Sequence, residues 1–184
     1  ASDLAKLWFW AGPMDKTIIT MGLHFGMRCV EMSRLQASDI REGPDGWMID
    51  LRGKGYGGQM SRSLSYVGEG QVMLDYWLQG RRIGPVLPSQ HRPEMPLSAG
   101  SISQRFTRLS QTAALSVKAH DLRHTFAQNL LTAGADLRDV SVAMGHQSMA
   151  TTTRYAGGEA VRLGMLGVKY FSTSPRPGAA VGAW

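Results

Sequence analysis

The chain has 184 residues, 43% of them hydrophobic and 18% charged, which predicts one well-cored domain and excludes a mainly disordered chain. A single cysteine, Cys29, excludes an intramolecular disulfide framework, and no apolar run is long enough to span a bilayer, so we expect a cytoplasmic protein. The net charge of +6 and the pI near 9.8 favour a polyanionic partner.

Helical spacing of apolar residues recurs along most of the chain, in segments bounded by serine caps, glycines and prolines. These segments are the opening stretch from Ser2 to Gly12-Pro13 and residues 14–24, 27–37, 67–80, 101–115, 121–134, 136–144, 149–155 and 159–166. Alternating runs at 46–55 and 58–67 predict a β-hairpin across a glycine-rich link. The proline-rich stretch 84–100 predicts a loop that contains a third short strand at Val86-Leu87. The predicted fold class is mainly α with a small antiparallel β-sheet (α+β).

The stretch HDLRH at 120–124 is open to three interpretations. His120 and His124 have the spacing at which two imidazoles on one helix face can bind zinc, but Arg123 beside them would repel a cation. His120 at the helix start and Arg123 one turn later could instead converge with free backbone N–H groups on a phosphate. A solvated first helical turn is the third interpretation, and the isolated motif favours it.

Other stretches of the chain complete a known pattern that includes HDLRH. The pattern has an arginine with an acidic residue three positions later, a lysine in a hairpin turn, a His-x-x-Arg, a Gly-His and a tyrosine nine positions after that histidine. The matching residues are Arg28, Glu31, Lys54, His120, Arg123, His146 and Tyr155. Over residues 14–160 the chain resembles the catalytic domain of the tyrosine recombinases, the phage-integrase family. FGMR and MGH depart from the usual Thr-Gly-Leu-Arg and Leu-Gly-His, but neither change replaces a group that touches phosphate.

The resemblance implies the tyrosine recombinase catalytic-domain fold and a site-specific recombinase that cleaves and rejoins DNA with no metal or other cofactor. Tyr155 would attack the scissile phosphorus and form a 3′-phosphotyrosyl link, which a second DNA end can reverse. Arg28 and Arg123 would hold the non-bridging oxygens, where negative charge develops. Lys54 would donate a proton to the 5′-oxygen. The task could be integration, excision or resolution of DNA.

The remaining matched residues have supporting roles in the family. His120 would assist deprotonation of the tyrosine or hold the phosphate, and His146 would donate to a non-bridging oxygen. Glu31 would support Arg28 or His120 from one turn away. Several further arginines are candidate contacts to the DNA backbone and are equally well read as solvated charges: Arg34, Arg52, Arg62, Arg105, Arg108, Arg138 and Arg154.

The resemblance also sets expectations for organisation and partners. We expect a catalytic domain at 1–170, a flexible Gly-, Pro- and Ser-rich tail at 171–184, and no upstream DNA-clamp domain in this chain. The apolar run at 7–10 should pack against another surface. Expected partners are double-stranded DNA and further copies of the protein, as a tetramer on DNA, with accessory DNA-bending proteins as additional candidates. A bacterial, phage or plasmid origin is expected.

Two other classes of function stay open at this point. A DNA-binding module that has lost catalysis is one, although the complete set of motif residues counts against it. A zinc hydrolase built on His120 and His124 is the other. Type IB topoisomerases share the tyrosine chemistry, but the short spacing from His146 to Tyr155 favours a recombinase.

Overall fold

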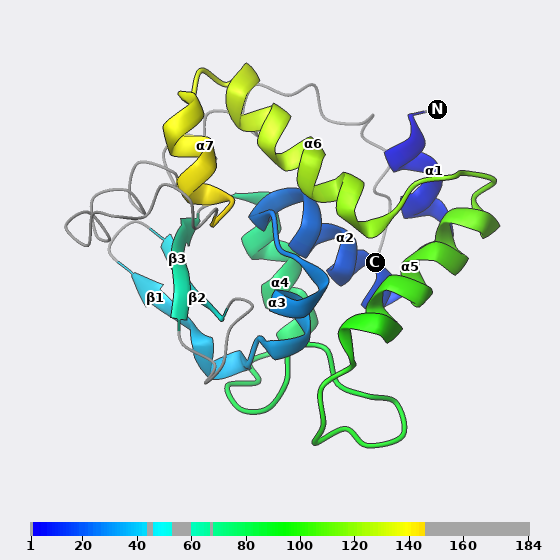
Figure 1. The fold of residues 1–184 in the computed structure, drawn as a ribbon. Helices are drawn as coiled ribbons and strands as arrows, with labels where there is room; N and C mark the ends of the chain where they lie inside the picture. Colours follow the sequence, from blue (N-terminus) through cyan, green and yellow to red (C-terminus); the bar gives the residue numbers. More distant parts are fainter. Residues whose placement is uncertain (1, 44–45, 53–59, 67, 146–184) are drawn as a thin grey trace.

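The computed structural model describes residues 2–43, 46–52, 60–66 and 68–145 (Figure 1). The helices predicted at 149–155 and 159–166 and the predicted tail lie outside these residues. The described part is mostly helical and carries one three-stranded antiparallel sheet, so the predicted fold class is confirmed. None of the described helices combines the length and the apolar character needed to cross a bilayer.

The described helices follow the predicted segments within a few residues. They are α1 (Asp3–Trp10), α2 (Pro13–Phe25), α3 (Cys29–Arg34), the 3₁₀ helix η1 (Ala37–Asp39), α4 (Glu69–Leu78), α5 (Ala99–Thr112), α6 (Ala119–Thr132) and α7 (Leu137–Ala143). The main difference is at 27–37, where α3 is shorter than predicted. The Asp39 carboxylate accepts a hydrogen bond from the Gln36 backbone N–H at 2.9 Å and caps η1, so the chain changes direction after Leu35.

The sheet contains the predicted hairpin and one strand that was not predicted. The hairpin is formed by β2 (Gly46–Arg52) and β3 (Met60–Tyr66), with Leu51 opposite Arg62, and β1 (Ile40–Gly43) pairs with the other edge of β2. The run IREG of β1 has one apolar residue and therefore gives no alternation signal.

The predicted strand at Val86-Leu87 is wrong. These two residues are fully buried in a loop between two isolated bridges, and the Trp77 indole N–H donates to the Val86 carbonyl at 2.7 Å. Pro85 and Pro88 flank the pair, and a proline has no N–H to donate to a sheet ladder. The apolar character of Val86 and Leu87 therefore indicates burial and not a β-strand.

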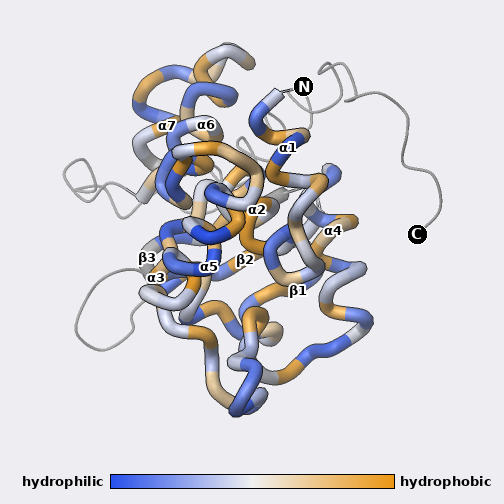
Figure 2. Tube along the Cα trace, turned by 90° about the vertical axis from the view of Figure 1, so that its right-hand side faces the viewer, coloured by the Kyte–Doolittle hydropathy of each residue, from blue (hydrophilic) through white to orange (hydrophobic). Residues whose placement is uncertain are grey.

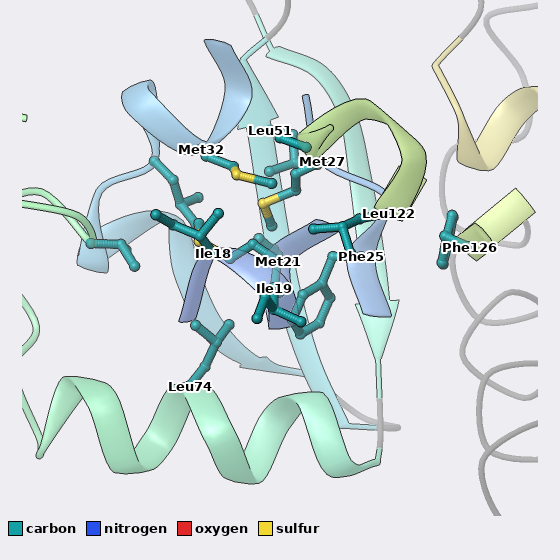
Figure 3. Close-up of a cluster of buried hydrophobic side chains, with 14 of the residues drawn as sticks. Ile18, Ile19, Met21, Phe25, Met27, Met32, Leu51, Leu74, Leu122 and Phe126 are labelled. Carbon is teal, nitrogen blue, oxygen red and sulfur yellow. The ribbon is translucent and has the colours of Figure 1, made fainter. Parts of the chain in front are cut away.

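Helix α2 lies at the centre of the helical layer and packs against α4, α5 and α6 (Figure 1). Ile18 and Ile19 have no exposed surface, and Leu74 points from α4 toward α2 (Figure 3). From the other side, alternate residues of β2, among them Ile49 and Leu51, bury their side chains in the same core. Hydrophobic segments accordingly gather around α2 and β2 in Figure 2.

The aromatic run in α1 is divided between core and surface. The Ser2 side chain caps the helix as predicted, accepting from the Ala5 N–H at 3.3 Å. Leu7 is buried and Trp8 packs against the core. Phe9 and Trp10, however, are 79% and 55% exposed on the described surface, and packing of these two residues against another surface stays a prediction.

The turn between α2 and α3 depends on Gly26. This residue has a φ of +58°, a conformation that side chains disfavour, and a Cβ added to it would lie 2.3 Å from Cδ1 of Phe126 in α6. Helix α6 therefore crosses directly over the turn. That crossing brings the carbonyl of Gly26, and Arg28 just after it, next to Arg123 of α6.

Candidate active site

Arg28 and Glu31 form the first half of the site at the beginning of α3. Arg28 is the N-cap residue, and its backbone N–H donates to Oε2 of Glu31 at 2.7 Å, a capping box. Its guanidinium Nη1 donates to Oε1 of the same carboxylate at 3.1 Å. The Glu31 side chain is completely buried and that of Arg28 is 35% exposed. The predicted contact between these residues is present.

Arg123 brings the second half of the site from α6. The Asp121 carboxylate caps this helix by accepting from the Lys118 N–H at 2.7 Å, so Arg123 lies one turn after the start, as predicted. Its guanidinium is 1% exposed and donates to the backbone carbonyls of Gly26 and Met144. Nη1 lies 3.7 Å from Oε2 of Glu31. Arg28 and Arg123 therefore converge on one carboxylate.

Arg62 completes the cluster. Its Nη2 donates to Oε2 of Glu31 at 3.1 Å and to the Gly26 carbonyl at 3.2 Å, and its side chain is 5% exposed. The sequence placed Arg62 among candidate contacts to the DNA backbone, whereas the structure buries it in the cluster, bonded to Glu31 and Gly26. The available signal was β-strand alternation, since Arg62 shares the inward face of β3 with Leu64.

The arginine cluster, defined as Arg28, Arg62 and Arg123 around Glu31, has more positive than negative charge. Three guanidiniums against one carboxylate leave an excess of two positive charges. Burial, and then the charges of Arg62 and Arg28, lower the pKa of Arg123 to about 9 despite Glu31. Burial likewise lowers the pKa of Arg62 to about 10, so both remain protonated at pH 7. Such an excess of buried positive charge favours binding of an anion.

The Gly145 of the MGH motif lies against this cluster. Its φ is +60°, and a Cβ added to it would lie 3.1 Å from Cδ of Arg62 and 3.8 Å from Nη1 of Arg28. The end of α7 thus reaches the cluster near β3 (Figure 1). Three predicted catalytic residues, Lys54, His146 and Tyr155, lie outside the described residues.

His120 lies in the first turn of α6 and is exposed, with its ring perpendicular to that of His124 and the centroids 4.6 Å apart. Burial of part of its surface, and then the positive charges of His124 and Arg123, lower the pKa of His120, which favours the neutral imidazole at pH 7. A neutral imidazole can accept a proton. Across the described residues, no three side chains of His, Cys, Asp or Glu are grouped as a metal ion would need, so the zinc interpretation has only this pair.

The remaining candidate arginines have varied surroundings. Arg52 is 47% exposed and pairs with Asp39 at 2.8 Å. Arg105 joins α5 to α2 through Asp15 at 2.5 Å, with 33% of its side chain exposed. Arg108 is exposed on α5, and Arg154 lies outside the described residues. Contact of these arginines with DNA stays a prediction.

Comparison with known proteins is consistent across sequence and structure. The phage integrase family profile matches residues 11–160. The chain is 32% identical over 175 residues to the tyrosine recombinase XerC of Bacillus licheniformis, covering 90% of this chain and 55% of the relative. It is 30% identical over 178 residues to XerC of Lactobacillus delbrueckii subsp. bulgaricus, covering 88% and 55%. The chain spans about half the length of the curated relatives it matches.

Solved structures show the same relationship at the level of the fold. The integrase from mycobacterium phage Brujita matches with a TM-score of 0.72 and 25% identity, over 92% of this chain and 55% of that one. The lambda integrase catalytic core matches with a TM-score of 0.61 and 18% identity, over 79% of this chain and 89% of that one. The predicted catalytic-domain fold is confirmed.

Proposed function

This chain belongs to the phage integrase family, and on that basis we propose that it is the catalytic domain of a tyrosine-type site-specific recombinase. The proposed reaction is cleavage and rejoining of DNA through a 3′-phosphotyrosyl intermediate. One observation carries the proposal: Arg28 and Arg123, from distant parts of the chain, meet at the buried carboxylate of Glu31. The resulting excess of positive charge suits one phosphate of the DNA backbone.

Arg28 and Arg123 are proposed to stabilise the transition state of DNA cleavage. Arg28 is the most exposed of the three guanidiniums and is proposed to contact a non-bridging oxygen first. The two carbonyl contacts of Arg123 use two of the five N–H donors of a guanidinium, which leaves donors for a second oxygen. Loss of either arginine should slow cleavage on the order of 100-fold, the scale of one lost preorganised donor.

The remaining steps rest on family positions. Tyr155 is proposed to attack the phosphorus, releasing the 5′-oxygen as a hydroxyl with a proton from Lys54. His120, favoured as the neutral imidazole, is proposed to accept the tyrosine proton, and His146 to donate to a phosphate oxygen. A second 5′-hydroxyl then attacks the phosphotyrosyl bond and restores the phosphodiester, so no external energy source is needed.

The proposed partner is double-stranded DNA, bound by several copies of the protein. One related structure is a lambda integrase tetramer bound to a Holliday junction, and another is the XerH recombinase bound to its difH substrate. We propose a comparable tetrameric assembly here. The net charge of +6 supports binding to a polyanion.

A covalent trap tests the activity. Nicked duplexes of randomised sequence lose the short strand after cleavage, so the phosphotyrosyl adduct accumulates and can be recovered under denaturing conditions. We expect wild type to form an adduct that Tyr155→Phe cannot form. Duplex binding by both proteins with no adduct would contradict the proposal and favour the DNA-binding module without catalysis.

A further inference from the structure

Arg62 and Arg123 share two hydrogen-bond acceptors although they come from a strand and a helix. Both donate to the Gly26 carbonyl, and both lie at Oε2 of Glu31, at 3.1 Å for Arg62 and 3.7 Å for Arg123. The other oxygen of Glu31 binds Arg28 at 3.1 Å. A displacement of the Glu31 carboxylate would therefore move a binding partner of both motif arginines, Arg28 and Arg123, and a displacement of the Gly26 carbonyl would move a partner of Arg123.

Burial of Arg62 is costly for the protein. Only 5% of the side chain is exposed, and its Nε and Nη1 have no hydrogen-bond partner within the described part of the chain. Its charge also repels Arg123, whose pKa it helps to lower. An apolar side chain at this inward-facing strand position would avoid both costs, as replacements of buried ion pairs show in other proteins. Stability alone does not account for an arginine here.

We propose that Arg62 is a positioning residue that holds Arg28 and Arg123 in the arrangement that receives a phosphate, by fixing the Gly26 carbonyl and the Glu31 carboxylate. This inference rests on the proposed function and adds a residue to it. Arg28 and Arg123 are the motif arginines, and Nη2 of Arg62 is already bonded to the Gly26 carbonyl and the Glu31 carboxylate, so Arg62 acts through these two groups and not on the substrate. Arg62 also ties β3, the strand that follows Lys54 in sequence, to the arginine cluster.

The bonding pattern suggests two substitutions. A single nitrogen, Nη2, makes both contacts of Arg62, and a lysine Nζ carries three donors and the same charge, so Arg62→Lys can restore both. Arg62→Met keeps an apolar stem and removes both contacts. The control is Arg81→Met, because Arg81 is a part-buried arginine outside the arginine cluster that likewise makes two hydrogen bonds, to the backbone carbonyls of Pro85 and Val86.

The first measurement is the rate of adduct formation at saturating protein on the nicked substrate, at a temperature at which circular dichroism shows every variant folded. Arg62→Met should cleave on the order of 100-fold more slowly than wild type, as expected for a misplaced catalytic group, with its affinity for the duplex unchanged. Arg62→Lys should recover most of the rate. Arg81→Met should lose stability and keep its rate.

The second measurement does not need catalysis. The Nε–Hε signals of Arg28 and Arg123 in ¹H–¹⁵N spectra report how firmly each guanidinium is held. We expect both signals to shift or to exchange faster with solvent in Arg62→Met, to return toward wild type in Arg62→Lys, and to stay unchanged in Arg81→Met.

The two measurements separate failure of this inference from failure of the proposed function. A cleavage rate for Arg62→Met within about threefold of wild type, with unchanged arginine signals, overturns the positioning role while leaving the recombinase intact. If wild type forms no adduct, the recombinase proposal fails and the arginine signals alone decide the role of Arg62. If Arg62→Met does not fold, Arg62→Lys is compared with Arg62→Gln instead. The inference is overturned if the cleavage rate and the arginine signals of Arg62→Lys are no closer to wild type than those of Arg62→Gln.

Discussion

Glu31→Gln removes the one negative charge that the three guanidiniums of the arginine cluster share. The carboxylate is completely buried, and its oxygens lie 3.1 Å from Nη1 of Arg28, 3.1 Å from Nη2 of Arg62 and 3.7 Å from Nη1 of Arg123. Glutamine has nearly the same shape, but it replaces one accepting oxygen with an amide that points hydrogens toward cations. The substitution therefore isolates the effect of charge from the effect of size.

The expected loss of stability follows from the burial of the partners. Breaking a buried ion pair by removing one partner costs ~3–5 kcal/mol, because the remaining charge stays in the interior. Arg28 is 35% exposed and partly screened by water, so we expect the lower end, ~3 kcal/mol. At ~2–4 °C per kcal/mol for a chain of this size, the midpoint of thermal unfolding should fall by ~6–12 °C.

The assay is urea and thermal unfolding followed by circular dichroism. Asp3→Asn is the control, because it removes a carboxylate from an exposed pair with Lys6 at 3.7 Å and should change the free energy of unfolding by less than ~0.5 kcal/mol. Sulfate should stabilise Glu31→Gln more than the control, because an anion can replace the lost charge. A loss for Glu31→Gln no larger than that for Asp3→Asn would refute the neutralising role of Glu31.

Three further predictions concern the surroundings of the site. Gly26→Ala forces a side chain into φ +58° and against Phe126, and in urea unfolding it should destabilise the protein by at least ~2 kcal/mol more than Gly80→Ala. Gly80 is the control because it has φ +78° and no atom within 4 Å of the added Cβ. Equal losses of stability would exclude a clash with Phe126 as the cause. Burial lowers the pKa of His24 from 6.5 to about 4, so the folded state favours the neutral ring. The free energy of unfolding should therefore fall by up to ~3 kcal/mol as the pH drops from 6.5 to about 4. His24→Gln should abolish this pH dependence, and an unchanged slope of stability against pH in the variant would contradict the role of His24. Burial raises the pKa of the Cys29 thiol, so its reaction with a disulfide reagent at pH 8 should be slower than that of glutathione. The reaction should become faster when urea unfolds the protein. A rate like that of glutathione in the folded protein would contradict the effect of burial on the thiol.

Local spacing predicted the parts of the site that depend on one helix. The three-residue separation of Arg28 and Glu31 is the spacing of a capping box, and HDLRH placed Arg123 one turn after a helix start. Both placements are present because helical geometry fixes them within a few residues. The meeting of the two segments came only from the family resemblance.

The features that sequence reasoning missed depend on tertiary contacts. Strand β1 has no alternating pattern and exists because β2 offers it an edge. The apolar pair Val86-Leu87 is buried by loop packing, which a strand signal cannot distinguish from a sheet. Arg62 was grouped with surface cations because arginine is mostly exposed in proteins, although strand alternation with Leu64 and its place opposite Leu51 both put it on the inward face.

The Gly26 carbonyl has a consequence for biosynthesis. It is joined to Arg62 across 36 positions of sequence and to Arg123 across 97, so both contacts close long loops of the chain. In a growing polypeptide that does not yet include α6, the residues of the arginine cluster cannot meet. The arginine cluster can therefore close only after α6 has been synthesised.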